Sequence, residues 1–233
     1  MEETFSLPPF PGFRPQAFQF LRDLEANNER EWFKARKEIY EEDLKAPLEL
    51  LLADGARRLA EAELPLTAHP KRSTFRIYRD MRFTDDERPY KTNLGAVFDR
   101  SGERARNGVV YVHVEPGNSF LGAGFYQPSV SYLRPIRQRI VDQPDTFSTL
   151  LDEMASRGLP PSSMDDTLTG MPRGFSDYRD TDLAPYLKWK HFVVRRKYAD
   201  DALQSPSFVD EVVRMTRDVR PLLQFVWEVE SAS

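Results

Sequence analysis

Residues 71–93 form the most unusual stretch of this 233-residue chain, with arginine and lysine lying among aromatic residues and next to acids. Arg76, Arg79 and Arg82 are spaced along it, and Lys91 follows near its end. Guanidinium groups suit planar, two-point recognition of a phosphate or a carboxylate, and a lysine adds a point charge. The segment therefore predicts a site for a phosphorylated or carboxylated small molecule or a nucleotide, in an enzyme or a sensor.

Neighbouring side chains could complete such a site. Tyr78 and Tyr90 can stack on a base or a sugar, or donate a hydrogen bond, and Asn93 adds an amide. Gly122 and Gly124 share a face of a later predicted strand, where they would let a ligand or a backbone approach closely. We count these five residues, together with the basic ones, as predicted ligand-binding positions.

Acidic side chains in the same stretch leave a second interpretation open. They could pair with the arginines and hold a loop in shape, each exposed pair contributing only about 0–1 kcal/mol. These acids are Asp80, Asp85, Asp86 and Glu87. If the segment is a ligand site, Asp80 is the candidate catalytic group: it would orient an arginine, or act as an acid or base if burial raised its pKa. A ligand site and a structural ion network both fit this composition.

The same stretch carries a resemblance to a known family. Residues 75–93 match the pattern F-R-I-[YN]-R-D-x-R-F-[ST]-x-D-K-x-P-Y-K-x-N, with Glu87 where the family usually has lysine. Further matching blocks lie at 27–33, 122–128 and 172–175. Over nearly its whole length the chain resembles the uncharacterised bacterial family called domain of unknown function 2461. The resemblance implies no activity.

Helices are predicted at the start of the chain, over residues 14–64. Pro15 suits the first turn of one helix, and Pro47 the start of another. Between them, Asn28 is predicted to cap a helix, with Glu31 three residues later completing a capping box.

A β-rich region is predicted over residues 73–126. Its expected strands lie at 75–79, 94–98, 109–115 and 119–126. The third is the clearest, because three valines alternate with Tyr111, His113 and Glu115, which should share the opposite face.

The remainder, residues 127–230, is predicted to mix helices and strands. Ser129 is expected to cap a helix whose face includes Arg137, and Pro144 to start the next. The other expectations are a loop at 158–180 with a short strand near Thr167, a strand at 189–196, and a helix at 208–226 that is kinked or broken before Pro221. The order of elements predicts an α+β fold with N-terminal helices, a central mainly antiparallel sheet and C-terminal helices, in one domain over 1–233.

Other charged residues have simpler interpretations. Asp166 belongs to a pair of acids expected to be solvated or to cap a helix, and Lys190 to a basic patch expected to protect an edge strand. Arg173 is expected in a turn from which it could reach a pocket. Of three histidines, His113 and His191 fall on predicted strands without metal-ligand spacing, so no metal site is predicted.

The composition of the chain argues against some classes of function and of cellular location. A net charge of −4 and a pI near 5.6 argue against sequence-blind nucleic-acid binding, although a nucleic-acid-associated protein and an interaction protein without a small ligand stay open as alternatives. No cofactor motif is present, so the cofactor is unknown. The absence of cysteine, of a signal peptide and of any long apolar run predicts a cytoplasmic protein without a membrane partner.

Overall fold

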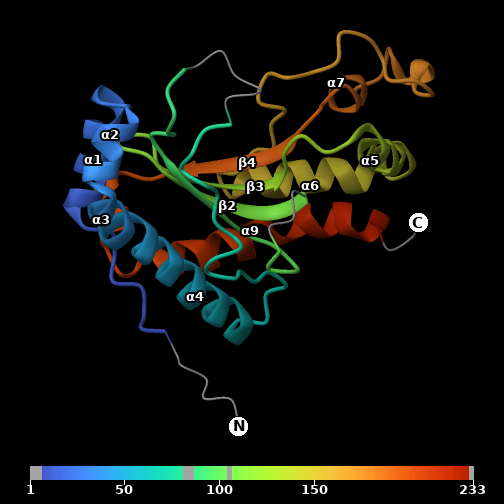
Figure 1. The fold of residues 1–233 in the computed structure, drawn as a ribbon. Helices are drawn as coiled ribbons and strands as arrows, with labels where there is room; N and C mark the ends of the chain where they lie inside the picture. Colours follow the sequence, from blue (N-terminus) through green and yellow to red (C-terminus); the bar gives the residue numbers. More distant parts are fainter. Residues whose placement is uncertain (1–6, 81–86, 104–106, 231–233) are drawn as a thin grey trace. The chain divides into compact units, whose positions relative to one another are not determined.

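The computed structural model describes residues 7–80, 87–103 and 107–230 (Figure 1). Within them, N-terminal helices are followed by a four-stranded antiparallel sheet and C-terminal helices. The predicted α+β fold class is therefore confirmed.

Two of the N-terminal helices begin at or next to the prolines that the sequence singles out. The N-terminal helices are α1 (Pro15–Ala26), α2 (Arg30–Ala35), α3 (Lys37–Ile39), the π-helical turn η1 (Tyr40–Lys45) and α4 (Ala46–Glu61). Pro15 and Pro47 each lie in the first turn of their helix, where the missing N–H has no partner to lose. Helix α4 packs on strand β1, since a methyl group on Gly55 would lie 2.7 Å from the ring of Phe98.

The predicted cap at Asn28 is wrong. Helix α2 begins after Glu29 and has no side-chain cap. Instead, the Asn28 amide nitrogen donates to the carbonyl of Tyr90, and its oxygen accepts from the Tyr90 N–H, both at 3.0 Å. An asparagine amide offers one donor edge and one acceptor edge, so it can pair with an extended backbone as well as cap a helix.

The sheet runs in the order β1–β2–β3–β4. Its strands are β1 (Leu94–Phe98), β2 (Asn107–Val114), β3 (Phe120–Phe125) and β4 (Phe192–Lys197). Leu94 pairs with Val114 and Phe98 with Val110 in antiparallel register. The alternation of valines in β2 explains the register, because it buries one face of the strand completely.

The expected strand at 75–79 does not form. Isolated bridges join Thr74 to Ala96 and Tyr78 to Tyr90 instead. The Phe75 N–H donates to the carbonyl of Gly95 on β1. Two residues later, the Ile77 carbonyl accepts from the N–H of Lys91, which lies before β1. The chain changes partner within five residues, so no continuous ladder can develop.

The C-terminal half mixes helices with one strand. The helices are α5 (Val130–Asp142), α6 (Pro144–Ser156), the 3-10 turn η3 (Ser176–Tyr178), α7 (Ala184–Leu187), α8 (Asp200–Gln204) and α9 (Phe208–Glu230). Ser129 caps α5 as predicted, accepting a bond from the Tyr132 N–H at 3.3 Å. Helix α9 continues through Pro221, so the predicted alternative of a break there is wrong. Buried residues on both sides of the proline, among them Val219 and Leu222, hold the helix in place.

The described residues pack into two compact units. The first consists of Met1–Ala105, Val110–Leu121 and Arg196–Met215, and the second of Arg106–Val109, Gly122–Arg195 and Thr216–Ser233. Four of the boundaries fall inside β2, β3, β4 and α9. A single domain over 1–233 stays a prediction. None of the described helices is long and apolar enough to cross a membrane.

Candidate functional site

The described parts of the predicted basic segment, residues 71–80 and 87–93, lie in the first unit, where Thr74 bridges to Ala96 of β1 and Tyr78 bridges to Tyr90. Arg76 is exposed and has no hydrogen bond or ion pair within the described residues. Arg79 is half-buried and donates from Nη2 to the carbonyl of Tyr90 at 3.4 Å. The Lys91 ammonium lies 6.0 Å from the ring centroid of Phe75. Arg82 lies outside the described residues.

Tyr90 and Tyr78 differ in their surroundings. Tyr90 is 5% exposed and stacks on Phe33 of α2, with ring centroids 4.1 Å apart. With the two bonds from Asn28, this stacking holds the basic segment to the N-terminal helices. Tyr78 is 52% exposed and keeps one side in contact with Tyr90. Asp80, the candidate catalytic group, is half-buried.

Asn93 lies next to a polar row on β2. The Tyr111 hydroxyl lies 3.0 Å from Nδ1 of His113, and the Asn93 amide nitrogen, which can only donate, lies 3.4 Å from it, so Nδ1 accepts from both. Nε2 of His113 lies 3.3 Å from a Glu115 carboxylate oxygen. With two donors at Nδ1, the proton of the neutral ring belongs on Nε2, where it is donated to Glu115. The predicted shared face of Tyr111, His113 and Glu115 is thus confirmed.

The two predicted glycines lie in β3, within the second unit. Gly124 has φ +118°, and a methyl group there would lie 2.1 Å from the carbonyl oxygen of Phe192. The space beside Gly124 is therefore filled by the backbone of β4. The sequence predicts that either a ligand or a backbone approaches this glycine closely, and here it is a backbone. Gly122 is half-buried.

A pocket of about 380 Å³ lies in the second unit, between the start of α5, the loop at 158–180 and the residues before β4. Its apolar lining residues are Pro128, Val130, Leu133, Leu168 and Pro172. Its polar lining residues are Gln127, Arg137, Asp166, Arg173, Lys190 and His191. Pockets of about 300–1,000 Å³ with mostly apolar walls and a few polar groups are typical of small-molecule sites.

Arg137 is the most unusual residue of this pocket. It lies on α5 and is only 4% exposed, yet it has no carboxylate partner among the described residues. Its Nη2 donates to the carbonyl of Trp189 at 3.0 Å, and its buried Nε has no hydrogen-bond partner among the residues that the structure describes. Burial lowers the pKa of the guanidinium, which nevertheless stays charged at neutral pH.

A chain of hydrogen bonds runs along one wall of the pocket. Lys190 donates to Asp166 at 2.6 Å, and the other carboxylate oxygen accepts from Nε2 of His191 at 3.1 Å. The bond from Lys190 is the main reason why the pKa of Asp166 is lowered. Nδ1 of His191 accepts from the Gln127 N–H at 2.8 Å, which fixes the neutral ring with its proton on Nε2. Both ring nitrogens are engaged, so His191 positions its neighbours in this arrangement.

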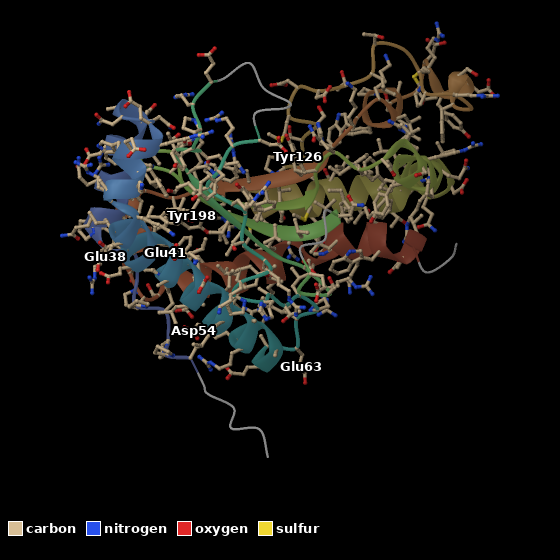
Figure 2. All side chains as sticks on the ribbon, in the orientation of Figure 1. Glu38, Glu41, Asp54, Glu63, Tyr126 and Tyr198 are labelled. Carbon is tan, nitrogen blue, oxygen red and sulfur yellow. The ribbon has the colours of Figure 1, made fainter. Side chains whose placement is uncertain are left out.

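The segment before α5 is held in an unusual conformation at the pocket. Gln127 has φ +49°, a left-handed conformation that is costly for a residue with a side chain. It is stabilised by the bond to His191, whose ring stacks on Tyr126 with centroids 4.9 Å apart. Tyr126, labelled in Figure 2, directly follows β3 and is 50% exposed. Strained residues of this kind often occur at binding sites.

Basic groups outnumber acidic ones in the pocket. Among its described lining residues, Arg137, Arg173 and Lys190 are cationic, and Asp166 is the one carboxylate. Arg173 is exposed and has no ion pair within the described part of the chain. The pocket therefore has an excess of two positive charges, in a chain whose net charge is −4.

Most of these pocket residues were not predicted as site residues. Asp166 was expected to be solvated or to cap a helix, and Lys190 to protect an edge strand. Arg173 was predicted to be able to reach a pocket, and it lines this one. A usable signal existed for Arg137, because it lies on the same helical face as Leu133 and Ile140. Within residues 7–80, 87–103 and 107–230, no group of three or more His, Cys, Asp or Glu side chains could hold a metal ion.

Comparison with known proteins gives a family and no activity. The sequence model of the family described as "Conserved hypothetical protein (DUF2461)" matches residues 16–225. No curated protein matches the chain.

Proposed function

Because the chain belongs to the DUF2461 family of conserved hypothetical proteins, whose description names no reaction, we propose its function from the pocket: it binds an anionic small molecule through Arg137. The ligand class is the one that the sequence predicts. The binding site that we propose, however, lies in the second unit and not at the basic segment 76–93.

The buried guanidinium of Arg137 carries the proposal. Burying a charge without a counter-ion costs several kcal/mol, and arginine cannot avoid this cost by losing its proton. A carboxylate or phosphate in the pocket would supply the missing counter-ion and a partner for the unbonded Nε. Without a ligand, Arg137 lowers the stability of the fold, as is common for groups retained for function.

The outer basic groups fit the same function. Arg173 is exposed at the pocket, and Lys190 is half-buried there. Positive charge around an apolar cavity raises the local concentration of anions and speeds their association. The overall acidic charge of the chain would keep nucleic acids away while leaving this local attraction to small anions.

Substitution of Arg137 by methionine tests the proposal. Arg137→Met removes the charge but keeps a long side chain, so the unliganded protein should be about 0–2 kcal/mol more stable than the wild type. The melting temperature should be measured with acetate, benzoate, phosphate, sulfate and adenosine monophosphate. At about 100 times its Kd, a ligand adds about 2.7 kcal/mol of stability, which Arg137→Met should abolish.

Arg134→Met is the matched control, because Arg134 is exposed on the same helix. It should retain the full ligand-induced shift. Arg173→Gln is a second test on an exposed residue and should weaken binding without affecting folding. If no anion in the panel raises the melting temperature of the wild type, the proposal is wrong.

The basic segment at 76–93 is the rival location for the same class of ligand. Arg76→Met distinguishes the two sites, since Arg76 is exposed and makes no bond within the described residues. With the ligand in the pocket, this variant should behave like the wild type. If Arg76→Met abolished the shift and Arg137→Met retained it, the site would belong to the segment.

We propose the cytoplasm as the location of the protein, because a chain without cysteine suits a reducing compartment.

A further inference from the structure

We infer that the pocket selects a monocarboxylate with an apolar body, in preference to a phosphate ester or a nucleotide. This inference rests on the proposed function, because it concerns the ligand of the same pocket. It follows from three properties of the pocket: its walls, the charges that its side chains leave unpaired, and its size.

The walls are suited to hydrocarbon. Val130 and Leu133 from α5 face the pocket together with Leu168 and two prolines. Three of the polar lining groups are engaged with one another, since Lys190 and His191 both bond to Asp166. The hydroxyl groups of a sugar would find few free partners here, and burying them unpaired is costly. A ligand body without hydroxyl groups avoids this cost.

Of the two positive charges in excess, only that of Arg137 is buried, whereas Arg173 is exposed, so the buried part of the pocket favours a single negative charge on the ligand. The Lys190 ammonium is already neutralised by Asp166 at 2.6 Å, which leaves Arg137 as the inner cation without a carboxylate partner. Asp166 also lines the pocket, so it would repel a second negative charge. One carboxylate matches one guanidinium, with planar geometry on both sides and the unbonded Nε as a donor. A phosphate dianion would bring more charge than Arg137 balances.

The size of the pocket sets the length of the ligand body. A cavity of about 380 Å³ lies at the lower end of the usual range for small-molecule sites. A single ring or a short branched chain next to a carboxylate would fit that range, whereas a nucleotide would need more room. Arg173, exposed at the pocket, can attract the anion without being buried with it.

Calorimetric titration with four probes tests this inference, because three of them each differ from phenylacetate in one property. Phenylacetate has both the charge and the apolar body, 2-phenylethanol lacks the charge, acetate lacks the body, and phenyl phosphate is mainly a dianion at pH 7.5. We expect phenylacetate to bind at least about ten-fold more tightly than each of the other three. Hexanoate, as an aliphatic monocarboxylate, should behave like phenylacetate.

Two variants with exposed side chains sharpen the test. Asp166→Asn removes the repelling carboxylate, so it should strengthen the binding of phenyl phosphate more than that of phenylacetate. Asp166 is 46% exposed, so this change should not prevent folding. Val130→Ser lies at the apolar wall and is 79% exposed, and it should weaken phenylacetate binding without affecting acetate.

The outcomes separate this inference from the proposed function. If phenyl phosphate or a nucleotide binds more tightly than phenylacetate and hexanoate, and Arg137→Met abolishes that binding, the proposed function holds and the inference is overturned. If no anion binds at all, both are overturned. If 2-phenylethanol binds as well as phenylacetate, the charge of Arg137 plays no part, and again both fail.

Discussion

Asp54 is a buried carboxylate that anchors the chain before α1. It lies on α4 (Figure 2), and its side chain is 1% exposed. It accepts hydrogen bonds from the Phe10 N–H at 3.1 Å, from Nη2 of Arg57 at 2.6 Å and from Nε of Arg58 at 3.2 Å. Burial alone would raise the pKa of Asp54, but these bonds outweigh it and lower the pKa below its usual value.

We expect Asp54→Ala to lower the free energy of unfolding by about 1.5–3 kcal/mol at pH 7, because the buried Phe10 N–H loses a charged acceptor. The folded-state pKa lies below the unfolded one, so this contribution is complete above about pH 4 and is lost as the pH falls through the folded pKa. Urea unfolding at several values between pH 7 and pH 2.5 measures both effects.

The difference between the wild type and Asp54→Ala should therefore shrink in acid. Asp152→Ala is the control, since Asp152 is exposed on α6 and has no bond within the described residues. It should change stability by less than about 0.5 kcal/mol. A difference at Asp54 that stays constant down to pH 2.5 would contradict the lowered pKa.

At the scale of single residues, the sequence predicts both a kind of chemistry, anion binding, and a place for it, the segment 76–93, and both stay predictions. The anion site is predicted at the segment 76–93 because its arginines and lysine are close in sequence. The charges of the pocket are separated in sequence. Asp166 and Lys190 are brought together by the bridge between Thr167 and Trp189, which no local pattern reveals. Arg137 could be recognised only from its helical spacing, which places a charged residue on the apolar face of α5.

The close approach of β3 and β4 depends on Gly124. Its φ of +118° is rarely adopted by residues with a side chain, and a Cβ would lie 2.1 Å from the Phe192 carbonyl oxygen. We expect Gly124→Ala to destabilise the protein by at least about 1–3 kcal/mol, because the strands must separate or the backbone must change. Thermal and urea unfolding would measure this loss.

Gly170→Ala is the matched control for that substitution. No atom of the described residues lies within 4 Å of the position that its Cβ would occupy, and its φ is not positive. Alanine there should leave stability unchanged or raise it by about 0.4–1 kcal/mol, by restricting the unfolded chain. Equal effects of the two substitutions would show that the strands do not approach each other as closely as described.

Helices and strands with a clear local sequence signal were predicted well, whereas the segment that changes its hydrogen-bonding partner along its length was not. The valine alternation of β2 and the prolines that open α1, α4 and α6 are local signals, and they placed these elements correctly. The segment 75–79 also alternates, yet it bonds first to β1 and then to residues 89–91. Periodicity reports which face is buried, whereas a strand also needs one continuous partner.

For the whole molecule, the order of elements was enough to predict the α+β class. The division into two units was beyond reach of the sequence, because its boundaries fall within strands and within α9, where no linker composition marks them. Three of the four strands contribute residues to both units. Each of these three strands is therefore one continuous piece of chain that begins in one unit and ends in the other.

This shared use of strands leads us to expect one cooperative unfolding transition, as predicted for a single domain. The three tryptophans can test it, because Trp32 belongs to the first unit and Trp189 and Trp227 to the second. Trp32→Phe leaves fluorescence from the second unit only, and the double variant Trp189→Phe/Trp227→Phe leaves fluorescence from the first. In each variant, the urea midpoint from fluorescence should coincide with the midpoint from circular dichroism at 222 nm.

Comparing two probes within each variant removes the effect of the substitutions themselves, which matters because Trp227 is buried and its replacement will lower stability. Any such loss shifts both midpoints equally if unfolding is two-state. Should the fluorescence midpoint fall below the circular dichroism midpoint in one variant and above it in the other, the units would unfold separately. A ligand of the Arg137 pocket would then raise only the midpoint of the second unit, whereas in a cooperative molecule it stabilises the entire chain.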